Sequence, residues 1–192
     1  VVDTEAQPNQ TALIINGDMA ISQRSTSVTS ITDDGYHTID RFKLLLDTLG
    51  TWTQTQESLT SGNAYTDGFS NALKMDCTTA DGSPAAGDRM FLYQRLEGQD
   101  LQLLKKGTAN AEKLTLSFWV KATKTGTNIC ELGDNDNSRK ISQSYTISSS
   151  DTWEKKVINF AADTTGVLGD DNGASLDVVW WLGAGTNYTS GT

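Results

Sequence analysis

Two tryptophans fall among polar side chains on predicted strands, opposite the apolar face of each strand. In KLTLSFWVKAT (residues 113–123) every second residue is apolar, and Trp119 falls between them on the polar face. In SLDVVWWL (residues 175–182) Trp181 likewise lies opposite the apolar face. An aromatic ring can stack on the apolar face of a sugar while polar neighbours bond its hydroxyl groups.

These rings predict a surface that binds carbohydrate or a protein partner, with Trp119 and Trp181 close together on one sheet. Two alternatives stay open: each ring is buried beneath another element or subunit, or it is exposed without a ligand. The candidate binding residues are Trp119, Trp181, Thr115, Ser117, Lys121 and Asp177.

Residue types that serve catalysis are sparse. His37 is the single histidine and no GxSxG motif accompanies it, so we interpret it as a loop or strand-edge residue. Glu97 shares a strand face with Arg95, which predicts a cross-strand ion pair, whereas glycoside hydrolysis needs a second carboxylate facing the same sugar bond. We therefore predict that the chain is not an enzyme and keep Gln94, Arg95 and Glu97 as secondary binding candidates.

One segment, GDNDNSRK (residues 133–140), resembles the first half of a calcium-binding loop, with Asp134 and Asp136 at alternate positions. An EF-hand would need a glutamate at the twelfth position, where this chain has Tyr145, and flanking helices. We interpret the segment as a hairpin turn. A structural Ca²⁺ held by loop carbonyls and one or two aspartates stays an alternative, and no other cofactor is expected.

The charge balance restricts the partners. The chain has 15 Lys and Arg against 24 Asp and Glu, a net charge of −9, which opposes binding to nucleic acid and to anionic membranes. No apolar run approaches the roughly 20 residues that span a bilayer, so no membrane insertion is expected. Cys77 and Cys130 are predicted to be free and mostly buried thiols, with one disulfide as the alternative.

Short alternating segments separated by Gly, Asp, Asn and Ser predict an all-β, antiparallel two-sheet sandwich with at most one short helix. The predicted strands cover residues 11–17, both sides of a turn at 47–50, and 70–80, 89–98, 113–123, 128–135, 139–148, 153–162 and 175–185. Residues 22–36 are predicted as a loop and 99–107 as one or two helical turns. The predicted core contains Leu73, Met75, Leu114, Leu116, Phe118, Val120, Leu176, Val178 and Trp180.

A resemblance to domains of phage virion proteins is carried by LIINGDMAISQR, YHTIDRFKL, YQRLEGQDLQLLKKGTANAEKLTLSFWVKATKTGT, SDTWEKKVINFAADTTG and DNGASLDVVWWLGAGTNYTSGT. These domains occur in tail-fibre-like and other appendage proteins, especially of marine and cyanobacterial phages. Phe42 stands where the family usually has tryptophan. The resemblance implies a jelly-roll sandwich similar to carbohydrate-binding modules over residues 11–192, after an arm or linker at 1–10, with further strands expected beyond Thr192.

The resemblance also implies a non-enzymatic domain on the virion surface, in a tail or head appendage, that binds host cell-surface carbohydrate outside the cell. The alternatives are a structural decoration or assembly protein that binds other virion subunits and, more weakly, a polysaccharide depolymerase. Because repeated weak sugar sites gain avidity, we expect a homo-oligomer, with a trimer favoured.

Overall fold

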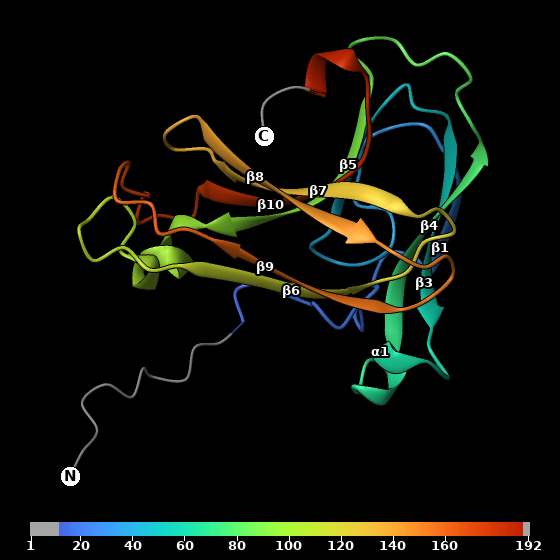
Figure 1. The fold of residues 1–192 in the computed structure, drawn as a ribbon, viewed down its shortest axis with the longest axis horizontal. Helices are drawn as coiled ribbons and strands as arrows, with labels where there is room; N and C mark the ends of the chain where they lie inside the picture. The colour runs from blue at the N-terminus through green and yellow to red at the C-terminus, as the bar shows by residue number, and fades with distance from the viewer. Residues whose placement is uncertain (1–11, 190–192) are drawn as a thin grey trace.

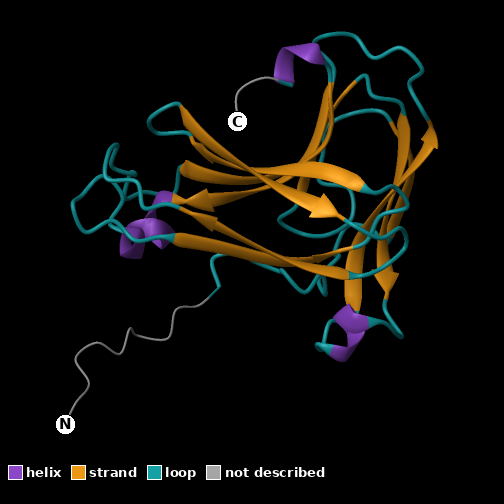
Figure 2. Ribbon diagram, viewed as in Figure 1, coloured by secondary structure: helices purple, strands orange, loops and turns teal. Residues whose placement is uncertain are grey.

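Ten antiparallel strands form two facing layers in the computed structural model, which describes residues 12–189 (Figures 1 and 2). One layer is a five-stranded sheet in the order β2-β5-β10-β7-β8. The other layer is divided between a three-stranded sheet, β1-β3-β4, and a two-stranded sheet, β6-β9. This architecture confirms the predicted antiparallel two-sheet β-sandwich.

The strands are short, and most match the predicted segments. The five-stranded sheet contains β2 (Lys43–Asp47), β5 (Arg89–Glu97), β10 (Ala174–Ala184), β7 (Gly126–Asp134) and β8 (Arg139–Ile147). The second layer contains β1 (Ser27–Ile31), β3 (Thr51–Ser58), β4 (Asn71–Thr79), β6 (Leu114–Val120) and β9 (Glu154–Phe160). Outside the strands lie a short α-helix, α1 (Asn63–Thr66), and two 3₁₀ segments, Gly98–Leu104 and Thr186–Tyr188. No helix among the described residues has the length and apolar character needed to cross a membrane.

The core fills the space between the layers in two clusters. Where β10 and β7 face β6 and β9, Leu176 and Val178 pack with Ile158 and Phe160. The second cluster lies between β2 and β5 and the three-stranded sheet. The alternating pattern predicted this arrangement, because one face of each strand must be removed from water. Of the predicted core, Leu176 and Val178 are buried, Met75, Leu114, Leu116, Phe118 and Trp180 pack against the clusters, and Leu73 and Val120 are partly exposed.

The first described residues do not form the predicted strand. Residues 12–20 make bends and turns, and Asn16 adopts a left-handed conformation with φ 58°. The backbone of Ile15 is bound by the buried amide of Gln94, whose Oε1 accepts from the Ile15 N–H at 2.7 Å and whose Nε2 donates to its carbonyl at 2.9 Å. A side chain therefore satisfies the backbone groups that a neighbouring strand would otherwise have paired.

The predicted loop at 22–36 contains β1. Apolar and polar residues do not alternate regularly in this strand, so the sequence pattern did not reveal it. The pairing register of β1 with β3 shifts between Val28 and Ile31, and Ser30 between them has φ 57°. This irregularity interrupts the two-residue period. Buried Ile31 still contacts the core, so the segment is held as an edge strand.

Both cysteines are free, so the alternative of a disulfide is wrong. Cys130 on β7 is fully buried, and burial raises the pKa of its thiol to about 12. Cys77 is exposed, contrary to the prediction, because β4 is the edge strand of its sheet and little covers it.

Candidate functional site

Four aromatic rings form a continuous row on the outer face of the five-stranded sheet. Phe91 and Tyr93 extend from β5, Trp181 from β10 and Tyr188 from the 3₁₀ segment that follows β10. The ring centroids are 5.5 Å apart for Phe91 and Tyr93, 4.9 Å for Phe91 and Trp181, and 5.8 Å for Trp181 and Tyr188. We call these four residues the aromatic row.

The register of the strands assembles this row. Trp181 lies opposite Phe91, and Val179 lies opposite Tyr93, in the antiparallel pairing of β10 with β5. Residues directly opposite one another share a face, so the two strands present their rings side by side. Trp180 points to the other face and packs against Phe42 and Phe118 in the interior, at centroid distances of 6.0 and 6.1 Å.

Cationic side chains lie over both ends of the row. The Arg95 guanidinium and the Lys43 ammonium lie 5.2 and 5.9 Å from the centre of the Tyr93 ring, and the Arg89 guanidinium lies 5.2 Å from that of Tyr188. Such contacts favour one placement of each ring. Tyr93 is consequently buried, whereas Tyr188 remains 40% exposed.

Two carboxylates from adjacent strands lie beside the row. Glu131 on β7 accepts a hydrogen bond from the Trp181 indole at 3.3 Å and forms an ion pair with Lys140 at 2.8 Å. Asp177 on β10 forms an ion pair with Arg95 at 3.2 Å. Burial raises the pKa of Asp177, and the nearby Arg95 charge offsets part of that effect. The face therefore combines apolar rings with hydrogen-bonding groups of both charges.

The structure divides the predicted site residues between two surfaces. Trp181, Asp177 and Arg95 come together beside the aromatic row, and Glu97 follows Arg95 along β5. Trp119 instead lies on β6, which pairs with β9 in the other layer. The expectation that Trp119 and Trp181 share a sheet is therefore wrong, because the parity of a residue in its strand fixes its face but not the sheet that the strand joins.

Trp119 lies on a surface that is partly covered by its own chain. The Lys155 ammonium is 5.8 Å from its ring centre, and Lys155 is tied to Asp67, beside α1, at 3.4 Å. The Trp119 indole nitrogen is buried and has no hydrogen-bond partner within residues 12–189. The neighbouring candidates on β6 also make local contacts: Thr115 donates to Asn159 at 2.9 Å. Ser117 is exposed, and Lys121 lies over the Trp153 ring at 5.5 Å.

Gln94 points away from the aromatic row. It is fully buried between the layers, and both ends of its amide are bonded to Ile15. This side chain therefore positions the first described residues of the chain.

Residues 133–140 form the predicted hairpin turn between β7 and β8, and Asp134 binds a lysine. The Lys106 ammonium donates to Asp134 at 2.5 Å and to the Gly166 carbonyl at 2.7 Å, and it lies 3.1 Å from an Asp163 oxygen. Burial alone would raise the pKa of both aspartates. Hydrogen bonds from Lys106 and Asn137 hold that of Asp134 below its ordinary value, and those from Thr165 and Lys106 lower that of Asp163 to about 2. In residues 12–189 no group of three or more His, Cys, Asp or Glu side chains could hold a metal ion.

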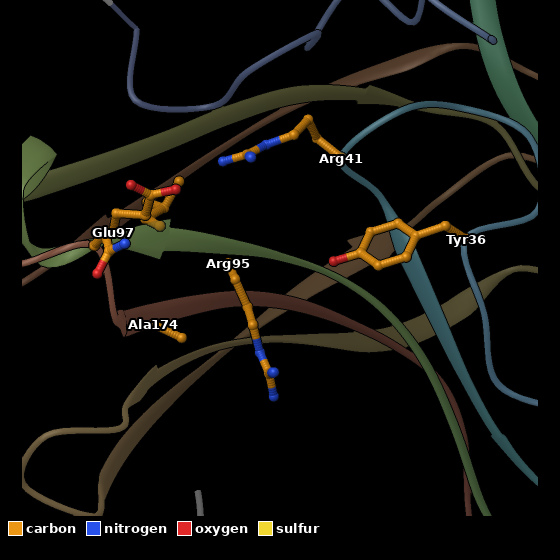
Figure 3. Close-up of a pocket in the computed structure, with 7 residues that line it drawn as sticks. Tyr36, Arg41, Arg95, Glu97 and Ala174 are labelled. Carbon is orange, nitrogen blue, oxygen red and sulfur yellow. The ribbon is translucent and has the colours of Figure 1, made fainter.

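A small pocket of about 150 Å³ lies where β5 extends past β2. Figure 3 shows the Tyr36 hydroxyl and the Arg41 guanidinium directed into this space, with the Glu97 side chain across from Arg41, while the Arg95 guanidinium turns away. The lining residues are Tyr36, Arg41, Arg95, Leu96, Glu97, Asn172 and Ala174.

Sequence reasoning missed Phe91, Tyr93, Tyr188 and Glu131. In RMFLYQRLE both alternating sets contain apolar residues, because β5 is a central strand with a covered inner face and an aromatic outer face. Arg89, Phe91, Tyr93 and Arg95 occupy every second position of this strand, and this pattern could have indicated an aromatic outer face bordered by arginines. Tyr188 follows the last strand, where no periodicity exists to place it.

The fold defines the class of the protein as an antiparallel β-sandwich, here with an aromatic row on one outer face. No protein-family model matches the chain, and no curated protein sequence matches it. Among solved structures, the chain is similar to the enzymatically active domain of the bacteriophage CBA120 tailspike protein 4, with a TM-score of 0.45 and 14% identity. The match covers 88% of this chain but 18% of that chain. This finding contradicts the prediction that the chain is not an enzyme, since the similar domain is described as enzymatically active.

Proposed function

We propose that the aromatic row binds carbohydrate of a host cell surface, on a phage tail-associated protein exposed at the virion surface. The observation that carries the proposal is the row itself, with its centroid spacings of 4.9–5.8 Å and its border of Arg, Lys, Asp and Glu side chains. Aromatic faces stack on the apolar faces of sugars, and the bordering groups bond hydroxyls. The phage setting is supported by the sequence resemblance described above.

The face around Trp119 supports this function less well. It offers one indole ring with a lysine over it, and the indole nitrogen is already buried. In the aromatic row Phe91 and Trp181 are partly exposed and Tyr188 is open to solvent, whereas Tyr93 is buried and supports the row from one end. A ligand with several sugar residues would therefore find more apolar contact on the five-stranded sheet. Repetition of the face in a homo-oligomer, with three copies favoured, would add avidity.

Replacement of Trp181 tests the proposal. Trp181→Ala should weaken glycan binding by about 1–3 kcal/mol, because a stacked ring is lost while the inner face of β10 is untouched. A glycan array with the parent protein identifies a ligand, and isothermal titration calorimetry then measures the affinities.

Trp119→Ala is the matched control, since it removes the same side chain from the other layer. It should leave the affinity unchanged. If Trp119→Ala lost binding while a folded Trp181→Ala variant retained it, the ligand would bind the face around Trp119, and the proposal would be refuted.

Hydrolysis of the bound glycan is a second candidate function. Glu131 and Asp177 project from adjacent strands beside Trp181, and the pKa of Asp177 is raised by burial, as suits a group that delivers a proton. New reducing ends released from a bound polysaccharide would support cleavage. A ligand recovered intact after prolonged incubation would leave binding as the function.

A further inference from the structure

The pocket beside the aromatic row contains a strained arginine. Arg41 has φ 73°, a left-handed conformation that costs a side-chain-bearing residue energy and that glycine or asparagine adopts more readily. Its neighbours hold it there: Ile39 and Phe42 are buried, and the Phe42 N–H reaches the Ile39 carbonyl at 3.4 Å. Among the described residues the Arg41 guanidinium makes no hydrogen bond or ion pair, so the strain does not serve an internal contact of its side chain.

The opposite wall of the pocket carries an acceptor. The Glu97 carboxylate receives one hydrogen bond, from the Gln99 amide at 2.8 Å, on one of its two oxygens. No ion pair joins Glu97 to Arg41 in the described part of the chain, although Figure 3 shows the two side chains across the same space. The pocket thus has a donor and an acceptor on opposite sides of a gap, and the Tyr36 hydroxyl points into that gap.

The pocket continues the aromatic row. Arg95 lines it and also lies over the Tyr93 ring, and Glu97 is the next residue on the same face of β5. Pairing of β2 with β5 runs only from Arg89 to Tyr93, which leaves this part of β5 free of a strand on that side in the described structure. A chain of sugars lying along Trp181 and Phe91 and passing over Arg95, which covers the buried Tyr93 ring, would therefore reach the pocket with a later residue.

We propose that this pocket binds one neutral, hydroxyl-bearing sugar residue, with Arg41 donating to one hydroxyl group and Glu97 accepting from its neighbour. This inference rests on the proposed function of the aromatic row. The volume of about 150 Å³ is similar to that of a cavity that holds a six-membered ring. A sugar hydroxyl both donates and accepts, so adjacent hydroxyls match an Arg and a Glu together. Because one positive and one negative side chain face the gap, a uronic acid or an amino sugar would meet a like charge as well as an opposite one.

Two substitutions test the pocket without disturbing the fold. Arg41→Gly removes the guanidinium and also relieves the left-handed backbone, so a loss of binding cannot be ascribed to strain. Glu97→Gln keeps the shape and removes the charge. The probes are neutral hexose oligosaccharides and uronic-acid oligosaccharides, each two to six residues long, titrated by calorimetry. Glu57→Gln, at the exposed end of β3, is the control for charge alone.

The parent should gain affinity for neutral oligosaccharides at the length that first reaches the pocket. Both variants should lose that gain, by about tenfold, and bind the shorter probes as the parent does. Trp181→Ala should weaken every length. Stronger binding of uronic-acid probes than of neutral probes by the parent, or an Arg41→Gly variant with the length dependence of the parent, would overturn the pocket alone. A parent that binds no probe would contradict the proposed function and the pocket together.

Discussion

The Lys106 side chain connects loops that are distant in sequence. Its side chain is mostly buried, and its ammonium bonds Asp134, Asp163 and the carbonyl oxygens of Thr165 and Gly166. These acceptors come from the β7–β8 turn and from the segment before β10, which are distant in sequence. The charge of Lys106 therefore joins the loops at one end of the sandwich, and removing it would leave two aspartates facing each other.

We expect Lys106→Met to lower the free energy of unfolding by about 3–5 kcal/mol, the usual consequence of leaving buried charges without their partner. Urea denaturation followed by tryptophan fluorescence measures this change. The adjacent Lys105→Ala is the matched control: its ion pair with Glu112, at 3.0 Å, is largely exposed and should be worth less than about 1 kcal/mol. Equal effects of the two substitutions would contradict the structural role of Lys106.

At the level of elements, the N-terminal segment is fastened to β5 through the Gln94 amide rather than through a strand ladder. It lies on the inner side, where Leu13 and Ile14 pack against the core between β10 and β6. These two side chains add apolar contacts to the first core cluster.

Gln94→Ala should release this segment. The Ile15 N–H and carbonyl would lose their partners, at a cost of about 1–3 kcal/mol, and the amides near Ile15 should exchange hydrogen faster than in the parent. Hydrogen–deuterium exchange with mass spectrometry measures the local effect. Gln143→Ala, an exposed position on β8, should leave the exchange unchanged. Unaltered protection near Ile15 in Gln94→Ala would show that the core contacts alone hold the segment.

The comparison of sequence and structure also belongs to this level. Alternation predicted nine of the ten strands found in residues 12–189, because each has one face to bury; β1 was missed at its irregular register. For the site, parity placed Trp181 and Asp177 on one face of their strand, and the pairing of β10 with β5 brings Arg95 beside Asp177. Parity could not show that Trp119 and Trp181 lie in different layers, because the pairing of distant strands leaves no local sequence pattern. For the same reason it could not predict the contact between Tyr188 and Trp181.

For the whole molecule, the carboxylates with shifted pKa values determine the response to acid. Burial, outweighed by hydrogen bonds, leaves the pKa of Asp163 at about 2 and that of Asp134 below its ordinary value, whereas burial raises that of Asp177. A carboxylate with a lowered pKa binds its proton more readily in the unfolded chain, so it stabilises the fold above its ordinary pKa of 3.8. Asp177 has the opposite sign and offsets part of this gain.

The free energy of unfolding should therefore be nearly constant above about pH 5 and fall as the pH decreases through 3.8 toward 2. Urea denaturation at intervals between these values measures the slope. In Lys106→Met the slope should be smaller, because the interaction that lowers both pKa values is gone. A stability that is the same at about pH 5 and pH 2.5 would contradict the assignment.

Tyr188 completes the aromatic row one residue before the described residues end at Thr189, whereas the first described residues lie on the side of β6 (Figure 1). The two ends are thus unequal as attachment points. A sensor chip, bead or fluorescent fusion coupled at the C-terminal end would sit beside Trp181 and compete with a polymer for space. Coupling through the first described residues, on the side of β6, would direct the row toward solution, and this orientation is the one to choose for measuring binding.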